Sequence, residues 1–136
     1  MKTLLTRKHR FHYAHRNTKM IGDKCEALHG HTAHVDVVLV NDTKGKAVGI
    51  PFEQADSIIT PVMKRLCHSL IVWEEDEVYK LLKHLDYMKF TILPVESSAE
   101  NITAYLYNTL TNLGLPVHKI IFRETPSSEI HYPVNL

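Results

Sequence analysis

The chain has 136 residues, a length that suits one domain with its own core, and we expect a single domain over residues 1–136. Its net charge of +1 excludes binding to nucleic acid or acidic membranes through overall charge alone. The opening segment MKTLLTRKHRFHYAHR lacks the apolar stretch and cleavage site of a signal peptide, and no apolar run is long enough to span a bilayer. We therefore expect a cytoplasmic protein whose two cysteines, Cys25 and Cys67, are free thiols.

Residue patterns predict an alternation of strands and helices. In chain order they are strands over 4–15 and 31–40, a helix over 51–66 with a kink or break at Pro61, a short helix over 76–88, a strand over 89–95, a helix over 97–114 that starts with a Ser97–Glu100 capping box, and a strand over 117–125. The first two strands should pair as antiparallel neighbours. This order predicts an α+β fold with an antiparallel sheet covered on one face and with open edges that a second subunit can close.

Histidines are concentrated near the start of the chain. Of the ten histidines, six lie between residues 9 and 34: His9, His12, His15, His29, His31 and His34. Residues i and i+2 of a strand point to the same side, so His29 and His31 can face one point, and His15 ends the neighbouring strand. Three imidazoles with an open fourth position are typical of a catalytic zinc site, although copper, nickel and iron also accept imidazole. The other three histidines are expected to be structural or exposed.

Cys25 lies four residues before His29, in a loop marked by Asn17 and Gly22. Its thiol has three interpretations: a fourth metal ligand, a small buried residue, or a reactive group whose pKa a nearby metal lowers. Core packing is the weakest of the three, because charged residues flank the cysteine.

Several segments together resemble the 6-pyruvoyl-tetrahydropterin synthase / 6-carboxy-tetrahydropterin synthase family. FHYAHR with CEALHGH is similar to its metal and cysteine motif, LCHSLIVWEEDE to its Asp-His segment, SSAEN to its Pro-Thr-x-Glu-Asn helix start, and RETPSSEIHY to its Glu-Thr strand end. The resemblance extends from Phe11 to Tyr132. Three residues between Cys25 and His29 resemble the bacterial carboxy branch of the family.

The resemblance implies a fold, an activity and roles for individual residues. The fold would be the tunnelling fold: a four-stranded antiparallel sheet with helices on one face, joined across subunits into a barrel and stacked as a homohexamer, a dimer of trimers. The site residues would be His15, His29 and His31 as zinc ligands, Cys25 as general base, His68 as its proton-relay partner, Glu124 as the anchor of the pterin ring, and Ser98 as a contact to the pterin edge.

The implied reaction is a zinc-dependent lyase reaction on a small molecule. It would convert 7,8-dihydroneopterin triphosphate to 6-carboxy-5,6,7,8-tetrahydropterin, with release of acetaldehyde and triphosphate, as a step towards queuosine and other deazapurines. The alternatives are a 6-pyruvoyl-tetrahydropterin synthase, a pterin side-chain aldolase, or a non-catalytic pterin- or metal-binding relative.

Two positions depart from the family pattern. Cys67 stands where the family has the aspartate before the relay histidine, and Pro51 stands where it has an aspartate before phenylalanine. A neutral thiol should orient His68 less well than a carboxylate does. Glu100 is expected to serve the capping box rather than a ligand.

Overall fold

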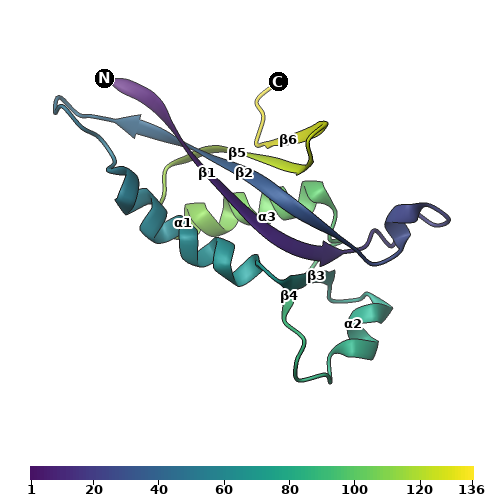
Figure 1. The fold of residues 1–136 in the computed structure, drawn as a ribbon. Coiled ribbons are helices and arrows are strands. Elements are labelled where there is room, and N and C mark those ends of the chain that lie inside the picture. Colours follow the sequence, from purple (N-terminus) through teal and green to yellow (C-terminus); the bar gives the residue numbers. More distant parts are fainter.

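The computed structural model describes all residues, 1–136, as one curved sheet with helices packed against it (Figure 1). The elements follow in the order β1 (Lys2–His15), the short 3-10 turn η1 (Lys24–Glu26), β2 (His29–Asp42), α1 (Phe52–Leu66), β3 (Ser69–Trp73), α2 (Glu77–Leu82), β4 (Phe90–Leu93), α3 (Ala99–Asn112), β5 (Val117–Thr125) and β6 (Ser128–Tyr132).

The sheet has six strands in the order β4-β3-β1-β2-β5-β6. Strand β3 runs parallel to both β1 and β4, whereas the other neighbours are antiparallel. The α+β class and the pairing of the first two strands are therefore confirmed. The expected count of four strands and the purely antiparallel sheet are wrong, because β3 and β6 add to the strands that the sequence patterns predict.

The two additional strands carry weak sequence signals. β3 is a short, continuous apolar run, SLIVW, with no alternation, and its first four residues are buried. Such a run cannot be assigned from periodicity alone. β6, SEIHY, is mostly polar and forms only by pairing with β5 as an edge strand after the turn at Pro126 and Ser127.

The core lies between one face of the sheet and helices α1 and α3. Alternate residues of β1 and β2, such as Phe11 and Val35, point to this face and are 0–1% exposed. Helix α1 contributes Ala55, Ile59, Val62, Met63 and Leu66, and helix α3 contributes Ile102, Leu106 and Leu110. The face that these helices cover is thus fixed by the period of two along the strands and the helical spacing of the apolar residues.

Helix α1 continues through Pro61 without a break, contrary to the expected interruption. Pro61 and Ser57 lie on the exposed side of the helix. The hydrogen bond that proline cannot make would go to the carbonyl of Ser57, which water can satisfy there. Helix α2 is shorter than expected and ends at Leu82.

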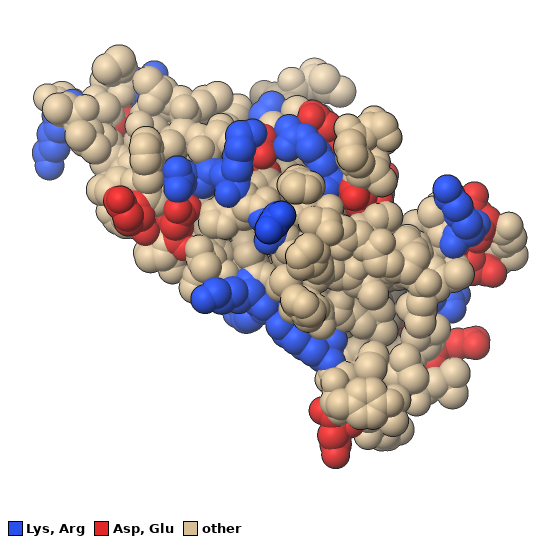
Figure 2. Space-filling view, in the orientation of Figure 1, with Lys and Arg blue, Asp and Glu red and all other residues tan.

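Several charged side chains pair with side chains of opposite charge. Asp36 contacts both Lys8 (3.3 Å) and Arg123 (3.1 Å), and Arg123 also binds Glu129 (2.8 Å). Figure 2 shows basic and acidic side chains both spread over one side of the molecule. Helices with the length and apolar character needed to cross a membrane are absent from the fold.

Candidate metal and substrate site

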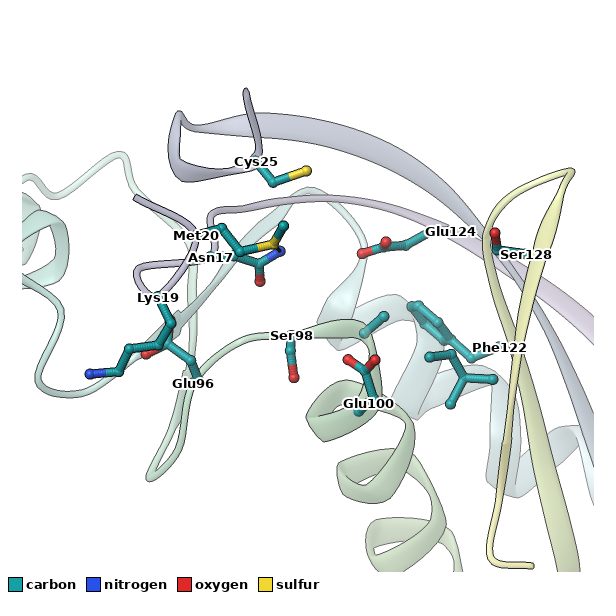
Figure 3. A pocket seen from close by; sticks show the side chains of 12 residues that line it. Asn17, Lys19, Met20, Cys25, Glu96, Ser98, Glu100, Phe122, Glu124 and Ser128 are labelled. Carbon is teal, nitrogen blue, oxygen red and sulfur yellow. Dashed lines mark hydrogen bonds between the residues drawn. The ribbon is translucent and has the colours of Figure 1, made fainter. Parts of the chain in front are cut away.

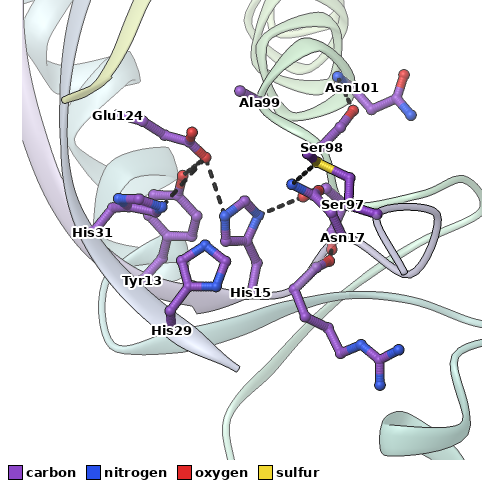
Figure 4. A network of polar contacts seen from close by, with 12 residues as sticks. Tyr13, His15, Asn17, His29, His31, Ser97, Ser98, Ala99, Asn101 and Glu124 are labelled. Carbon is purple, nitrogen blue, oxygen red and sulfur yellow. Dashed lines mark hydrogen bonds and ion pairs between the residues drawn. The ribbon is translucent and has the colours of Figure 1, made fainter. Parts of the chain in front are cut away.

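Three histidines converge where β1 ends and β2 begins (Figure 4). The antiparallel register places His15 opposite His29 and Tyr13 opposite His31. Directly paired residues on antiparallel strands share a face, and so do residues i and i+2, so all four side chains point to the core side of the sheet. The ligand atoms of His15, His29 and His31 lie within 4.8 Å of one another. The structure thus brings together the three histidines that the sequence singles out.

Backbone carbonyls orient two of these rings. His15 Nδ1 lies 2.6 Å from Ser97 O, and His29 Nδ1 lies 2.7 Å from Ala27 O. A carbonyl only accepts hydrogen bonds, so each Nδ1 is the donor, and each Nε2 is left to bind a proton or a metal ion. This pattern, in which one ring nitrogen donates to a carbonyl, is the usual support of a metal-binding histidine.

The second ring nitrogen of His15, Nε2, indicates where a metal ion can bind. His15 Nε2 is buried and has no hydrogen-bond partner, although Glu124 Oε1 lies 3.1 Å away. A lone pair and a carboxylate oxygen at this separation repel each other unless a proton or a metal cation lies between them. The donor set of three imidazoles therefore fits a transition-metal ion.

The protonation of His31 agrees with a ligand role. Burial lowers its pKa, and the neighbouring His15 and His29 lower it further, whereas Glu124 acts in the opposite direction. His31 is therefore neutral at pH 7 and has a lone pair available.

Glu124, at the end of β5, faces the histidines. It accepts a hydrogen bond from Tyr13 Oη (2.6 Å), and its Oε1 lies 3.7 Å from His31 Nε2. Burial acts to raise the pKa of Glu124, but His15 and the hydrogen bond from Tyr13 outweigh burial and lower the pKa to about 2. Glu124 is thus a carboxylate at neutral pH, available to accept hydrogen bonds from a ligand.

A cavity of about 420 Å³ opens beside Glu124 (Figure 3). One wall is the loop between β1 and β2, with Asn17, Lys19, Met20 and Cys25, and the opposite wall is the start of α3, with Ser98, Ala99 and Glu100. The rest of the lining comes from Glu96 and from β5 and β6, with Phe122, Glu124, Ser128 and Ile130. The volume suits a small-molecule ligand. Cys25, Ser98 and Glu124 therefore face one cavity from a single chain.

Cys25 lies in η1 and lines the cavity, so it is not a core residue. It is also absent from the group of residues whose ligand atoms converge. The carboxylate of Asp23 accepts a hydrogen bond from Cys25 N (2.8 Å). Asp23 raises the pKa of the Cys25 thiol and partial burial adds to this effect, whereas Lys24 opposes it. In the free protein the thiol is therefore protonated at neutral pH.

The start of α3 differs from the expected capping box. Ser98, not Ser97, is the N-cap, and its Oγ accepts from Asn101 N (3.2 Å). Ser97 is buried, with its Oγ donating to Arg16 O. Glu100 is consequently free of the capping role and points toward the cavity in Figure 3. The sequence analysis missed Glu100 as a cavity residue, because the offset from Ser97 to Glu100 mimics a capping box.

His68 lies apart from this cavity. It is exposed, its backbone has a positive φ of 62°, and its backbone N–H donates to His12 O (2.6 Å). Its Nδ1 lies 3.2 Å from Cys67 Sγ, which also accepts from His12 N. His12 and His15 are three residues apart on β1 and therefore point to opposite faces of the sheet. Within one chain, His68 thus lies away from the cavity that Cys25 lines. Cys67 contacts the His68 ring, which a thiol at this position was expected to orient less well than a carboxylate.

The other sequence features have structural explanations. Pro51 occupies the N-cap of α1 and makes no side-chain cap, which an aspartate there could supply. His9 binds Asp56 (3.0 Å) and His12 binds Thr32 (2.9 Å), while His34 is exposed. These three histidines have the structural or surface positions expected of them.

Comparisons with known proteins give the relatives of this chain. The family model described as 6-pyruvoyl tetrahydropterin synthase matches residues 4–134. The 6-carboxy-5,6,7,8-tetrahydropterin synthase of Haemophilus influenzae is 30% identical over 80% of this chain and 84% of its own length, and the enzyme of that name from Aquifex aeolicus is 28% identical over 81% and 76%. The solved 6-pyruvoyl tetrahydropterin synthase of Caenorhabditis elegans superimposes with a TM-score of 0.70 at 21% identity, covering 99% of this chain and 97% of its own.

Proposed function

Since the chain belongs to the 6-pyruvoyl tetrahydropterin synthase family, we propose that it is a zinc-dependent 6-carboxy-5,6,7,8-tetrahydropterin synthase. The names of its relatives support a pterin synthase, and both curated relatives belong to the carboxy type. The proposed reaction converts 7,8-dihydroneopterin triphosphate to the 6-carboxy product with release of acetaldehyde and triphosphate. The observation that carries the proposal is that Cys25 and Glu124 line one cavity while Glu124 contacts two histidines of the triad.

The three histidines, Glu124 and Ser98 each have a role in this proposal. His15, His29 and His31 would hold Zn²⁺, which when bound acts as a Lewis acid towards the hydroxyl oxygens of the substrate side chain. Glu124 would accept hydrogen bonds from the amino and ring N–H groups of the pterin, since a carboxylate fits that pair of donors. Ser98 Oγ accepts from Asn101 N and keeps its own proton to donate to the pterin edge.

Cys25 would remove a proton from the substrate side chain as a general base. The thiol must first ionise, and the neighbouring Asp23 opposes this in the free protein. The positive charge of a bound metal ion would favour the thiolate. The proposed proton partner, His68, would have to come from another subunit, because its own chain holds it beside His12.

This requirement supports the proposal of a homohexamer built from two trimers. The sheet ends in two short edge strands, β4 and β6, whose outer sides are open to pairing with another chain. We expect light scattering at micromolar concentration to give the mass of six chains of 15.7 kDa. A monomer mass would contradict both the assembly and a site shared between subunits.

The function is tested by incubating the zinc-loaded protein with 7,8-dihydroneopterin triphosphate and identifying the products. We expect 6-carboxy-tetrahydropterin together with equal amounts of acetaldehyde and triphosphate. Release of triphosphate without acetaldehyde would assign the protein to the 6-pyruvoyl type instead. Binding of the pterin without any product would identify a non-catalytic relative.

A further inference from the structure

The loop that carries Cys25 has no anchor in the core. It comprises residues 16–28 between β1 and β2, and none of these residues is buried. The 3-10 turn η1 within it likewise contains no buried residue. Segments without buried apolar contacts open locally at low free energy, so a few polar contacts must decide where this loop lies.

Glu96 supplies the strongest of these contacts. Its Oε1 accepts from Thr18 N at 2.8 Å, and its Oε2 accepts from Thr18 Oγ1 at 2.6 Å. Both carboxylate oxygens are therefore engaged by one residue of the loop, in hydrogen bonds that the negative charge strengthens. The remaining contacts lie at the two ends of the loop or are longer. Ala27 O accepts from His29 Nδ1 at 2.7 Å and Arg16 O accepts from Ser97 Oγ at 3.2 Å, whereas Arg16 Nε lies 3.7 Å from Asp76 Oδ2 and Lys19 Nζ lies 5.5 Å from the centre of the Trp73 ring.

A short path connects Glu96 to the thiol residue. Thr18 is held by Glu96, and the preceding residue, Asn17, donates its backbone N–H to Cys25 O at 2.8 Å. The two arms of the loop are thus joined at Asn17 and Cys25, and Glu96 fixes this junction to the rest of the molecule. Figure 3 shows Glu96, Asn17 and Cys25 around the same cavity.

The segment that contains Glu96 also supports the other parts of the site. Glu96 O accepts from Asn101 Nδ2 (2.9 Å), Ser97 O orients His15, and Ser98 caps α3. Three consecutive residues therefore contact the thiol loop, a histidine of the metal site and the helix that forms the opposite wall of the cavity.

We infer that Glu96 is a positioning residue that holds Cys25 in register with the histidine site through its two hydrogen bonds to Thr18. This inference rests on the proposed function for the role of Cys25, but the hold on the loop exists independently of any reaction. Glu96 also lines the cavity, but each of its carboxylate oxygens is directed to Thr18, so the role inferred for it is positioning.

The test compares Glu96→Ala and Thr18→Val with the conservative Thr18→Ser, all as the zinc-loaded protein. Hydrogen exchange of the amides of residues 17–26 should accelerate by about tenfold or more in Glu96→Ala, by less in Thr18→Val, which keeps its backbone N–H, and not in Thr18→Ser. The rate at which iodoacetamide alkylates Cys25, followed on the Cys25 peptide by mass spectrometry, should change most in Glu96→Ala, less in Thr18→Val and not in Thr18→Ser. Glu75→Ala is the matched control, because it removes an exposed carboxylate that pairs only with Lys80.

Turnover gives the second readout. In Glu96→Ala, kcat should fall by about 10- to 100-fold while zinc content and KM stay within about threefold, because misplacement of the thiol weakens the chemical step rather than binding. Exchange and alkylation rates of Glu96→Ala within twofold of the wild type would overturn the inference. If the wild type produces no pterin product, the proposed function fails while the exchange rates still decide the role of Glu96.

Discussion

Replacing His31 with alanine is expected to remove most of the zinc from the purified protein while leaving its fold intact. A three-histidine site that loses one ligand should lose at least about tenfold in affinity, since even the loss of a supporting partner costs about 10–100-fold. His31 is preferable to His15 for this test, because His15 is 1% exposed and its removal would leave a cavity beside Tyr13.

Elemental analysis of the purified variant gives the metal content, and thermal unfolding gives the stability. His34→Ala is the matched control, since it lies on the same strand, three residues further on, but is exposed and points to the other face of the sheet. The control should keep its zinc. Undiminished zinc in His31→Ala, with a normal unfolding transition in both variants, would exclude the proposed three-histidine site.

Replacing Cys25 with alanine should lower turnover of 7,8-dihydroneopterin triphosphate by about 10²–10⁴-fold, the usual contribution of a positioned general base. Zinc content should be unchanged, because Cys25 is not part of the group of converging ligand atoms. Pterin binding, measured by fluorescence or calorimetry, should also persist, because Glu124 and Ser98 remain in the cavity. Full activity in this variant would show that the general base is another residue.

The Asp23→Asn variant tests whether Asp23 controls the pKa of the Cys25 thiol. Asp23 raises the pKa of Cys25, so removing its charge should lower that pKa and increase the thiolate fraction at a given pH. The pH profile of iodoacetamide reaction at Cys25 should therefore move to lower pH. An asparagine can still accept from Cys25 N, which preserves η1 and makes the comparison a test of charge. An unchanged profile would show that Asp23 does not control the thiol.

The position of His68 relative to Cys25 could not be predicted from the resemblance between sequences. The sequence identifies His68 as a relay candidate from its neighbours in the chain, but a single chain directs it to the face that carries His12. The proposed contact of Cys25 with His68 of another subunit would depend on how subunits pair, which the sequence of one chain does not show. The contact between Cys67 and His68 depends in the same way on the left-handed backbone of His68, which no sequence pattern indicates.

Features that follow from short-range periodicity can be predicted from the amino-acid sequence alone. Alternation along β1 and β2 determined which side chains face the core, and the spacing of His29 and His31 directed both rings to one side. The apolar stripe of α1 determined its buried face in the same way. These features need no information beyond neighbouring residues, because the side-chain direction repeats every two residues in a strand and every 3.6 residues in a helix.

Contacts between segments far apart in the chain become visible only in the folded molecule. The apolar segment β3, in which apolar and polar residues do not alternate, and the polar segment β6 form strands because neighbouring strands supply their hydrogen-bond partners. Glu96 meets Thr18, Ser97 orients His15, and Glu124 approaches the histidines across separations that no local pattern encodes. Each of these polar groups has many possible partners of equal chemistry along the chain, and only the packing of the sheet against α1 and α3 selects one.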